Sequence, residues 1–127
     1  MTTATKSKIS EAALSEQAAE LLYQALETEL GGVQVYEAAI RCAKNSELKK
    51  EWKKYRSQTE RHVEIVRGIF DSLELDEDAP SPGRAIVKAR GQALVDAMEQ
   101  ALASAPEAAE IVAAECVVDA ETKDHAN

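Results

Sequence analysis

Residues 47–73, ELKKEWKKYRSQTERHVEIVRGIFDSL, carry the pattern that decides the fold. Apolar residues in this stretch return every three or four positions, which is the spacing of one face of a helix. The stripe runs through Leu48, Trp52, Tyr55, Thr59, His62, Val66, Ile69 and Leu73. The pattern predicts a long helix over residues 47–72 with one buried face, and it places the polar residues Thr59 and His62 on that face.

Three further helices are expected around this one, over residues 10–43, 84–103 and 105–127. Their apolar spacing is typical of bundle helices, and the breaks between them contain residues that favour helix ends. The fold class that we expect is all-α, a four-helix bundle made of two helical hairpins. The whole chain, residues 1–127, is expected to form a single domain.

The breaks inside the two hairpins have distinct signals. Asn45-Ser46 separates the first two helices, and Ser46 is the expected N-cap of the second. The stretch Ser104-Ala105-Pro106-Glu107 is typical of a capping box and separates the last two. The last helix is then expected to bury a stripe through Ile111, Glu115, Val118, Thr122 and His125.

Between the hairpins lies the connector, residues 71–83, DSLELDEDAPSPG, with five acidic residues, two prolines and a glycine. A connection of this length can run from one end of a bundle to the other. We therefore expect residues 71–83 to be a crossover, so that the helices on either side of it run parallel.

The charge of the chain excludes several kinds of partner. The formal net charge is −8, which argues against nucleic acid or an anionic membrane surface as the main partner. The basic run over residues 49–56 is interpreted as a solvated helix face. No apolar stretch approaches the roughly 20 residues of a membrane span, and the first ten residues lack the apolar core of a secretory signal. The two cysteines form no disulfide or metal-knuckle pattern, so a cytoplasmic location is expected.

Polar residues on the expected buried stripes point to a site. Residues 58–62 and 121–125 share the pattern [Gln/Glu]-Thr-x-x-His and contain the two histidines of the chain, His62 and His125. Glu29 lies about as far from the first hairpin turn as His62 does. A buried carboxylate must be paired, ligated or protonated, because isolating its charge costs several kcal/mol. The spacing therefore predicts that Glu29, His62 and His125 meet at mid-bundle, with Glu121 one position off the stripe.

The chain resembles the ferritin-like proteins, bacterioferritins above all, in the segments around these residues. Glu29-Leu30-Gly31-Gly32-Val33-Gln34-Val35-Tyr36 is similar to their first helix, residues 62–73 to their second, and the end of the chain at His125 to their fourth. The resemblance implies a carboxylate and imidazole site, usually for two iron or manganese ions. The family has Glu three residues before each His, where this chain has Thr59 and Thr122, and Arg90 stands near the place of a third-helix ligand.

Two hypotheses follow from these residues. The first is a ferritin-like metal-binding protein in which Glu29, His62, Glu121 and His125 hold iron or manganese for metal handling or oxidation. The second is a bundle without metal that acts as a structural or protein-interaction module, with Glu29 paired to Arg90. Whether the protein is an enzyme is left open. Helices rich in Ala and Val make a homo-oligomer a further expectation.

Overall fold

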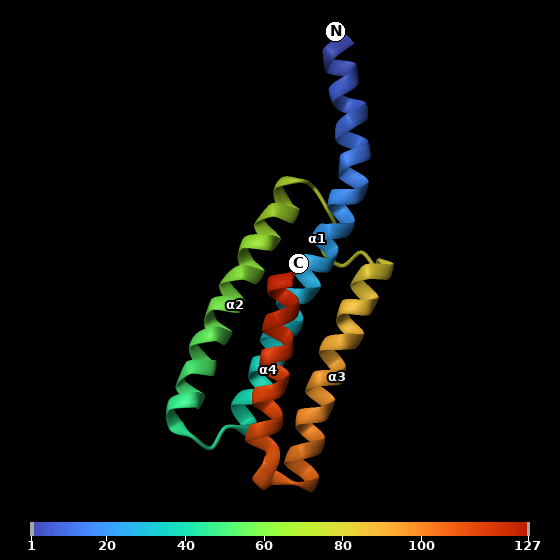
Figure 1. Cartoon of the computed structure of the whole chain (residues 1–127). Coiled ribbons are helices and arrows are strands. Elements are labelled where there is room, and N and C mark those ends of the chain that lie inside the picture. Colours follow the sequence, from blue (N-terminus) through green and yellow to red (C-terminus); the bar gives the residue numbers. More distant parts are fainter. Residues whose placement is uncertain (1, 127) are drawn as a thin grey trace.

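The computed structural model describes the backbone of residues 2–126 and the side chains of residues 16–122. It contains four α-helices and one short 3-10 helix, and no strand occurs within residues 2–126 (Figure 1). The helices are α1 (Thr2–Cys42), α2 (Ser46–Ser72), α3 (Pro82–Ser104), η1 (Pro106–Ala108) and α4 (Ala109–Ala126). The all-α expectation with four helices is thereby confirmed. None of the helices searched in the described residues is long and apolar enough to cross a membrane.

The direction of the third helix relative to the first two differs from the expected one. Helix α1 turns at its C-terminal end into α2, which runs back along it (Figure 1). Helix α3 starts beside the upper part of α1, where the backbone N–H of Gly83 donates to Glu20 Oε1 at 2.9 Å. It ends beside the C-terminal end of α1, where Arg41 Nη2 lies 3.3 Å from Glu99 Oε1. Helix α3 is therefore parallel to α1 and antiparallel to α2, so the expected end-to-end crossover is wrong.

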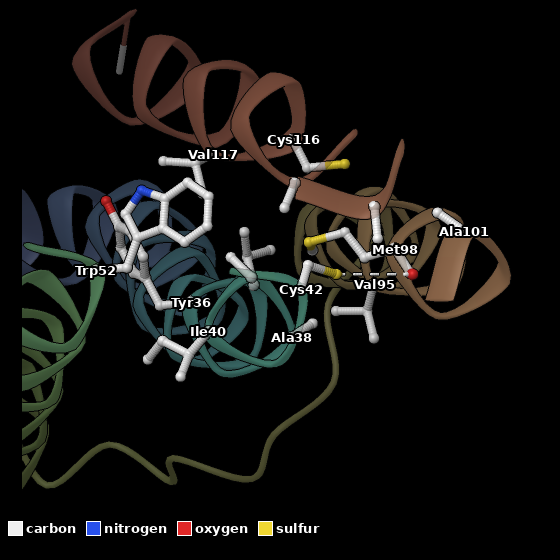
Figure 2. Close-up of a cluster of buried hydrophobic side chains, with 14 residues drawn as sticks. Tyr36, Ala38, Ile40, Cys42, Trp52, Val95, Met98, Ala101, Cys116 and Val117 are labelled. Atoms are coloured by element: carbon white, nitrogen blue, oxygen red, sulfur yellow. Dashed lines mark hydrogen bonds between the residues drawn. The ribbon is translucent and has the colours of Figure 1, made fainter. Parts of the chain in front are cut away.

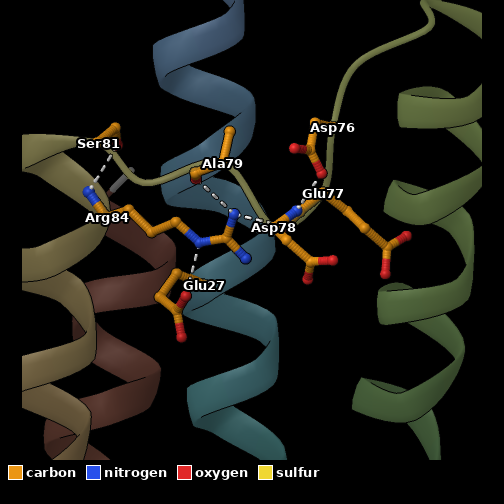
Figure 3. A network of polar contacts seen from close by, with 7 residues as sticks. All are labelled: Glu27, Asp76, Glu77, Asp78, Ala79, Ser81 and Arg84. Carbon is orange, nitrogen blue, oxygen red and sulfur yellow. Dashed lines mark hydrogen bonds and ion pairs between the residues drawn. The ribbon is translucent and has the colours of Figure 1, made fainter.

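The connector, residues 73–81, stays at one end of the bundle because Arg84 holds it there (Figure 3). Arg84 Nε donates to Glu27 Oε1 on α1 at 2.7 Å. Its Nη1 donates to the carbonyl oxygens of Glu77, at 2.5 Å, and of Ala79, at 3.1 Å. The side chains of Arg84 and Glu27 are only 12% and 14% exposed. These contacts fold the connector back over the first turn of α3 instead of stretching it along the bundle.

The helix caps also differ in detail from expectation. Asn45, and not Ser46, is the N-cap of α2, because its side chain accepts a hydrogen bond from the N–H of Leu48 at 3.0 Å. The expected capping box is absent, since Ser104 Oγ donates to the carbonyl of Gln100 at 2.7 Å. Ala105 precedes η1 without a side-chain cap. The chain therefore turns between α3 and α4 through Pro106 and the 3-10 helix.

Two groups of buried apolar residues hold the bundle together. The four-helix core lies toward the two hairpin turns and joins α1, α2, α3 and α4 (Figure 2). Its larger members include Tyr36, Trp52, Met98 and Val117. The two-helix core lies toward the opposite end and contains Leu26, Val63 and Phe70 from α1 and α2. The bundle is thus closed by all four helices at one end and by α1 and α2 at the other.

The buried faces of α2 and α4 are rotated from the expected stripes. In the second half of α2 the buried residues are Val63 and Phe70, whereas the side chain of His62, expected to be buried, is 55% exposed. The expected 4-3 spacing has a period of 3.5 residues, and a straight helix of 3.6 residues per turn drifts from it by about 20° per heptad. Over residues 48–73 this drift amounts to roughly one residue position.

In α4 the expected stripe is wrong along its whole described length. The buried residues are Ala109, Ala113, Cys116 and Val117. Ile111 and Val118 are 75% and 60% exposed, and Glu115 and Thr122 are exposed as well. Small side chains let α4 lie close to α1 and α3, so packing distance decided the face more than side-chain hydrophobicity did. The side chain of His125 lies outside the described residues.

Candidate functional site

A cavity of about 490 Å³ lies at mid-bundle, between the four-helix core and the two-helix core. All four helices contribute to its wall, which is mainly apolar. The polar and charged residues on the wall are Glu27, Thr28, Glu29, Tyr36, Tyr55, Gln58, Thr59, His62, Arg90, Asp119 and Glu121. The apolar and small residues are Gly31, Gly32, Val35, Val87, Gly91, Leu94, Val117 and Ala120.

The cavity exists because of how α2 and the small residues are arranged. In the described chain, α2 packs along α1, and neither α3 nor α4 packs along it. Helix α2 lies close to Gly32 of α1, where an added Cβ would meet Thr59 Cγ2 at a tight 3.2 Å, and α3 lies beside α1 at Gly91, where an added Cβ would be in ordinary contact with Gly31 Cα at 3.7 Å. The short side chains bring the backbones together but fill little of the space between them.

The structure brings two of the predicted site residues together on this wall. His62 Nδ1 lies 3.5 Å from Glu29 Oε2. Glu29 is well shielded, with 17% of its side chain exposed, whereas His62 is 55% exposed and so stands at an open edge. The pairing of α1 with α2 therefore places these residues at one level, as their distances from the turn predict. The expectation that His62 is buried is wrong.

Glu121 reaches the same cavity from α4 and is held there by a tyrosine. Tyr36 donates its hydroxyl proton to Glu121 Oε1. Tyr36 itself is buried, with 4% exposed. The bond from Tyr36 to Glu121 is not among the expectations from the sequence. The signal available was its spacing, because a residue seven positions after Glu29 lies on the same helix face.

A second tyrosine stands next to the first, from α2. The ring centroids of Tyr36 and Tyr55 are 6.0 Å apart. Tyr55 donates to Glu51 Oε1 at 2.6 Å, and this hydrogen bond together with the charge of Glu51 raises the pKa of Tyr55. Tyr55 is therefore protonated near neutral pH, and both phenols donate hydrogen bonds to carboxylates of the chain.

The remaining candidates, Gln58, Thr59, Arg90 and Thr122, differ in whether they line the cavity and in what they contact. Thr59 donates its hydroxyl to the carbonyl of Tyr55 at 2.8 Å, which is a hydrogen bond within α2. Gln58 and Arg90 are exposed and line the cavity. Thr122, predicted on the inner stripe, is exposed and does not line it.

A metal ion fits the described residues in part. Two ligand atoms, each about 2.1 Å from one ion at a roughly tetrahedral angle, lie about 3.4 Å apart. The 3.5 Å separation of Glu29 Oε2 and His62 Nδ1 is compatible with such a pair. Within the described part of the chain, no group of three or more His, Cys, Asp or Glu side chains is arranged to hold a metal ion. A complete ligand set thus needs a rearranged Glu121 and a contribution from His125.

The cysteines belong to the core and not to the cavity. Cys42 and Cys116 are both buried. The Sγ atom of Cys42 lies 3.8 Å from the carbonyl oxygen of Met98 (Figure 2), and that of Cys116 lies 3.7 Å from the carbonyl oxygen of Leu94. Burial raises the pKa of both thiols above the ordinary value. The thiols are therefore protonated near neutral pH, as is usual for cysteines buried in a packed core.

Neither protein-family models, nor curated proteins, nor solved structures include a match to this chain. What the protein does has to follow from the residues of the cavity.

Proposed function

We propose that this chain is a metal-binding protein with a ferritin-like set of carboxylate and imidazole donors, which takes iron or manganese at mid-bundle for metal handling or oxidation. The likeness lies in the donors and not in the order of the helices, because α3 runs parallel to α1. Glu29 and His62 would be the first ligands, with Glu121 and His125 completing the set. The observation that carries the proposal is the Glu29–His62 pair, 3.5 Å apart on the wall of a four-helix cavity.

The chemistry of the pair supports this choice of metal. Carboxylate with imidazole is a donor set suited to iron and manganese. The mainly apolar wall keeps bulk water from the shielded side of Glu29, which strengthens its attraction for a cation. Tyr36 binds Glu121, which lines the same cavity, so a second carboxylate is already close to this space. A bound iron ion with open positions would supply oxygen chemistry, the oxidation of ferrous iron.

Anaerobic titration of the full chain with Fe²⁺ and with Mn²⁺ near neutral pH tests the proposal. We expect stoichiometric binding of at least one of them, measured by calorimetry and by metal analysis after gel filtration. Removing a direct ligand by Glu29→Gln or His62→Ala should weaken binding by at least about 100-fold. His125→Ala and Glu121→Gln should weaken it as well.

Glu115→Gln is the matched control, because Glu115 is an exposed acid on α4 that does not line the cavity. It should bind metal as the unmodified chain does. If the unmodified chain binds neither ion, or if Glu29→Gln and His62→Ala both retain full affinity, the chain is not a metal protein of this kind.

A bundle without metal, acting as a structural or interaction module, is the second candidate. The described side chains favour it in one respect, since they include no group of three possible metal ligands. The expected partner of Glu29 is different, however: His62 Nδ1 lies 3.5 Å from Glu29 Oε2, and no ion pair of Glu29 with Arg90 is found among the described side chains. Under this alternative, Glu29→Gln lowers the midpoint of urea unfolding and leaves metal content unchanged.

Two further expectations stay predictions. A homo-oligomer is supported by the exposed apolar residues of the last hairpin, Ile86 on α3 and Ile111 and Val118 on α4. A cytoplasmic location rests on the sequence alone.

A further inference from the structure

We propose that the mid-bundle cavity also binds a small amphiphilic carboxylate, with its apolar body inside the cavity and its carboxylate on Arg90. The ligand class is a monoanion with a straight or aromatic body of medium length. This binding does not depend on a metal ion, because Arg90 is not one of the proposed metal ligands.

The size and lining of the cavity point to an organic ligand. The cavity volume of about 490 Å³ is many times the roughly 30 Å³ that one water molecule occupies in the liquid. A single metal ion is no larger than a water molecule, so it would fill only a small part of the cavity. Cavities of roughly 300–1,000 Å³ with mostly apolar walls and a few polar groups are typical of small-molecule sites. Val35, Val87, Leu94 and Val117 supply the apolar wall here.

The hydroxyl groups on the wall donate their protons within the protein, so the interior of the cavity suits the apolar part of a ligand. Tyr36 donates to Glu121, Tyr55 to Glu51, and Thr59 to the carbonyl of Tyr55. Each of these protons is used within the protein, so the rings and methyl groups are what the wall presents to a ligand. A water-filled space with such walls is less favourable than one filled by hydrocarbon.

Arg90 supplies the charge that selects an anion. It lines the cavity and is exposed, so it stands at an open edge. Among the side chains of residues 16–122, no ion-pair or hydrogen-bond partner is found for Arg90. Arg84, earlier on the same helix, is by contrast bound to Glu27. A guanidinium group binds a carboxylate through two parallel hydrogen bonds, which favours this head group.

The other charges on the wall favour a single negative charge over two. Glu29, Asp119 and Glu121 line the same cavity as Arg90. Their carboxylates repel a dianion such as hydrogen phosphate more strongly than a monoanion, while the one arginine compensates only one charge. A carboxylate on an apolar body satisfies both the charge and the lining.

Calorimetric titration of the metal-free full chain with octanoate tests the inference. We expect saturable one-to-one binding, with amide shifts in the NMR spectrum at the cavity residues Gly31, Gly32 and Gly91. Octanol, which lacks the charge, and inorganic phosphate, which lacks the body, should each bind at least about 10-fold more weakly. Arg90→Gln should weaken octanoate binding by about 10-fold and leave octanol binding unchanged.

Arg61→Gln is the matched control, because Arg61 is an exposed arginine of α2 that does not line the cavity. It should bind octanoate as the unmodified chain does. Ala120→Phe, which places a ring in the cavity, should abolish binding of both octanoate and octanol. The inference is overturned if octanoate does not bind, if phosphate binds as tightly, or if Arg90→Gln retains full affinity. Loss of metal binding in the Glu29 and His62 variants leaves this result unaffected, so the two proposals fail separately.

Discussion

Phe70 and its neighbour Ile69 show how a single residue position separates core from surface in α2. Phe70 is fully buried and packs against the ring of Tyr23 at a centroid distance of 5.7 Å. Ile69, which the 4-3 spacing places on the inner stripe, is 40% exposed. The difference comes from the rotation of the buried face along α2 between Trp52 and Phe70, which the heptad spacing does not follow.

Substitution of these two residues measures that rotation. Phe70→Ala should lower the free energy of unfolding by about 3–5 kcal/mol, because it leaves a large cavity in the two-helix core. Ile69→Ala should lower it by less than about 1 kcal/mol, since much of that side chain is already in water. Urea denaturation followed by far-UV circular dichroism measures both values. If Ile69→Ala lost more free energy of unfolding than Phe70→Ala, the buried face of α2 would be the one that the heptad spacing predicts.

At the scale of elements, Glu110 ties the start of α4 to the turn between α1 and α2. Its Oε2 accepts hydrogen bonds from the backbone N–H groups of Asn45, at 2.7 Å, and Lys44, at 2.6 Å. These two hydrogen bonds lower the pKa of Glu110 below its ordinary value of 4.5. The charged form is thus the one that the folded protein stabilises, and it links two turns that are distant in sequence.

The stability of the protein should therefore carry a pH-dependent part from Glu110. Because the pKa is lower in the folded state, this part is present above about pH 4.5 and is lost as the pH falls through the lower folded value. Glu110→Gln should have a lower urea midpoint than the unmodified chain at pH 7, and the difference should shrink below pH 4.5.

Glu107→Gln provides the comparison, because Glu107 is an exposed acid of η1 in the same segment. Its urea midpoint should follow that of the unmodified chain at both pH values. A gap between Glu110→Gln and the unmodified chain that stays constant from pH 7 to pH 3 would show that the carboxylate charge is not what holds the turns together.

At the scale of the whole molecule, the directions of the helices alternate along the chain. Helix α3 is parallel to α1 from the Gly31–Gly91 approach to the Arg41–Glu99 pair. A ferritin-like crossover would place α3 antiparallel to α1. The short path of the connector is stabilised by the ion pair of Arg84 with Glu27 and by the two carbonyl groups that Arg84 binds.

Spin labels on exposed positions distinguish the two arrangements. Cys42 and Cys116 are replaced by alanine, and new cysteines carry the labels. One replaces Glu37 on α1, and the other replaces either Gln100 or Lys88 on α3. The register of Gly31 with Gly91 gives axial offsets of about 4.5 Å for the pair 37–100 and about 13.5 Å for the pair 37–88. Double electron–electron resonance should therefore report the shorter distance for 37–100. The opposite order would establish the crossover.

Much of the local structure follows from the sequence itself. The four helices and the breaks between them follow from apolar spacing and from residues such as Asn45, Pro82 and Pro106, because helix formation depends on neighbours a few positions away. The start of the first helix does not, since α1 begins at Thr2 and not near residue 10 as expected. The common level of Glu29 and His62 follows too, since residues equally far from a tight turn lie opposite each other in a hairpin.

Tertiary structure alone decided the direction of α3, the rotated faces of α2 and α4, and the bond from Tyr36 to Glu121. Each depends on contacts between residues far apart in the chain, whose energies compete with one another and leave no local pattern. The connector is long enough to cross the bundle, but the ion pair of Arg84 with Glu27 keeps it at one end. Ile111 is more hydrophobic than Ala113, but Ala113 is the one that is buried, because its small side chain allows closer packing. The sequence determined where the helices form, and packing between them determined which residues face the cavity.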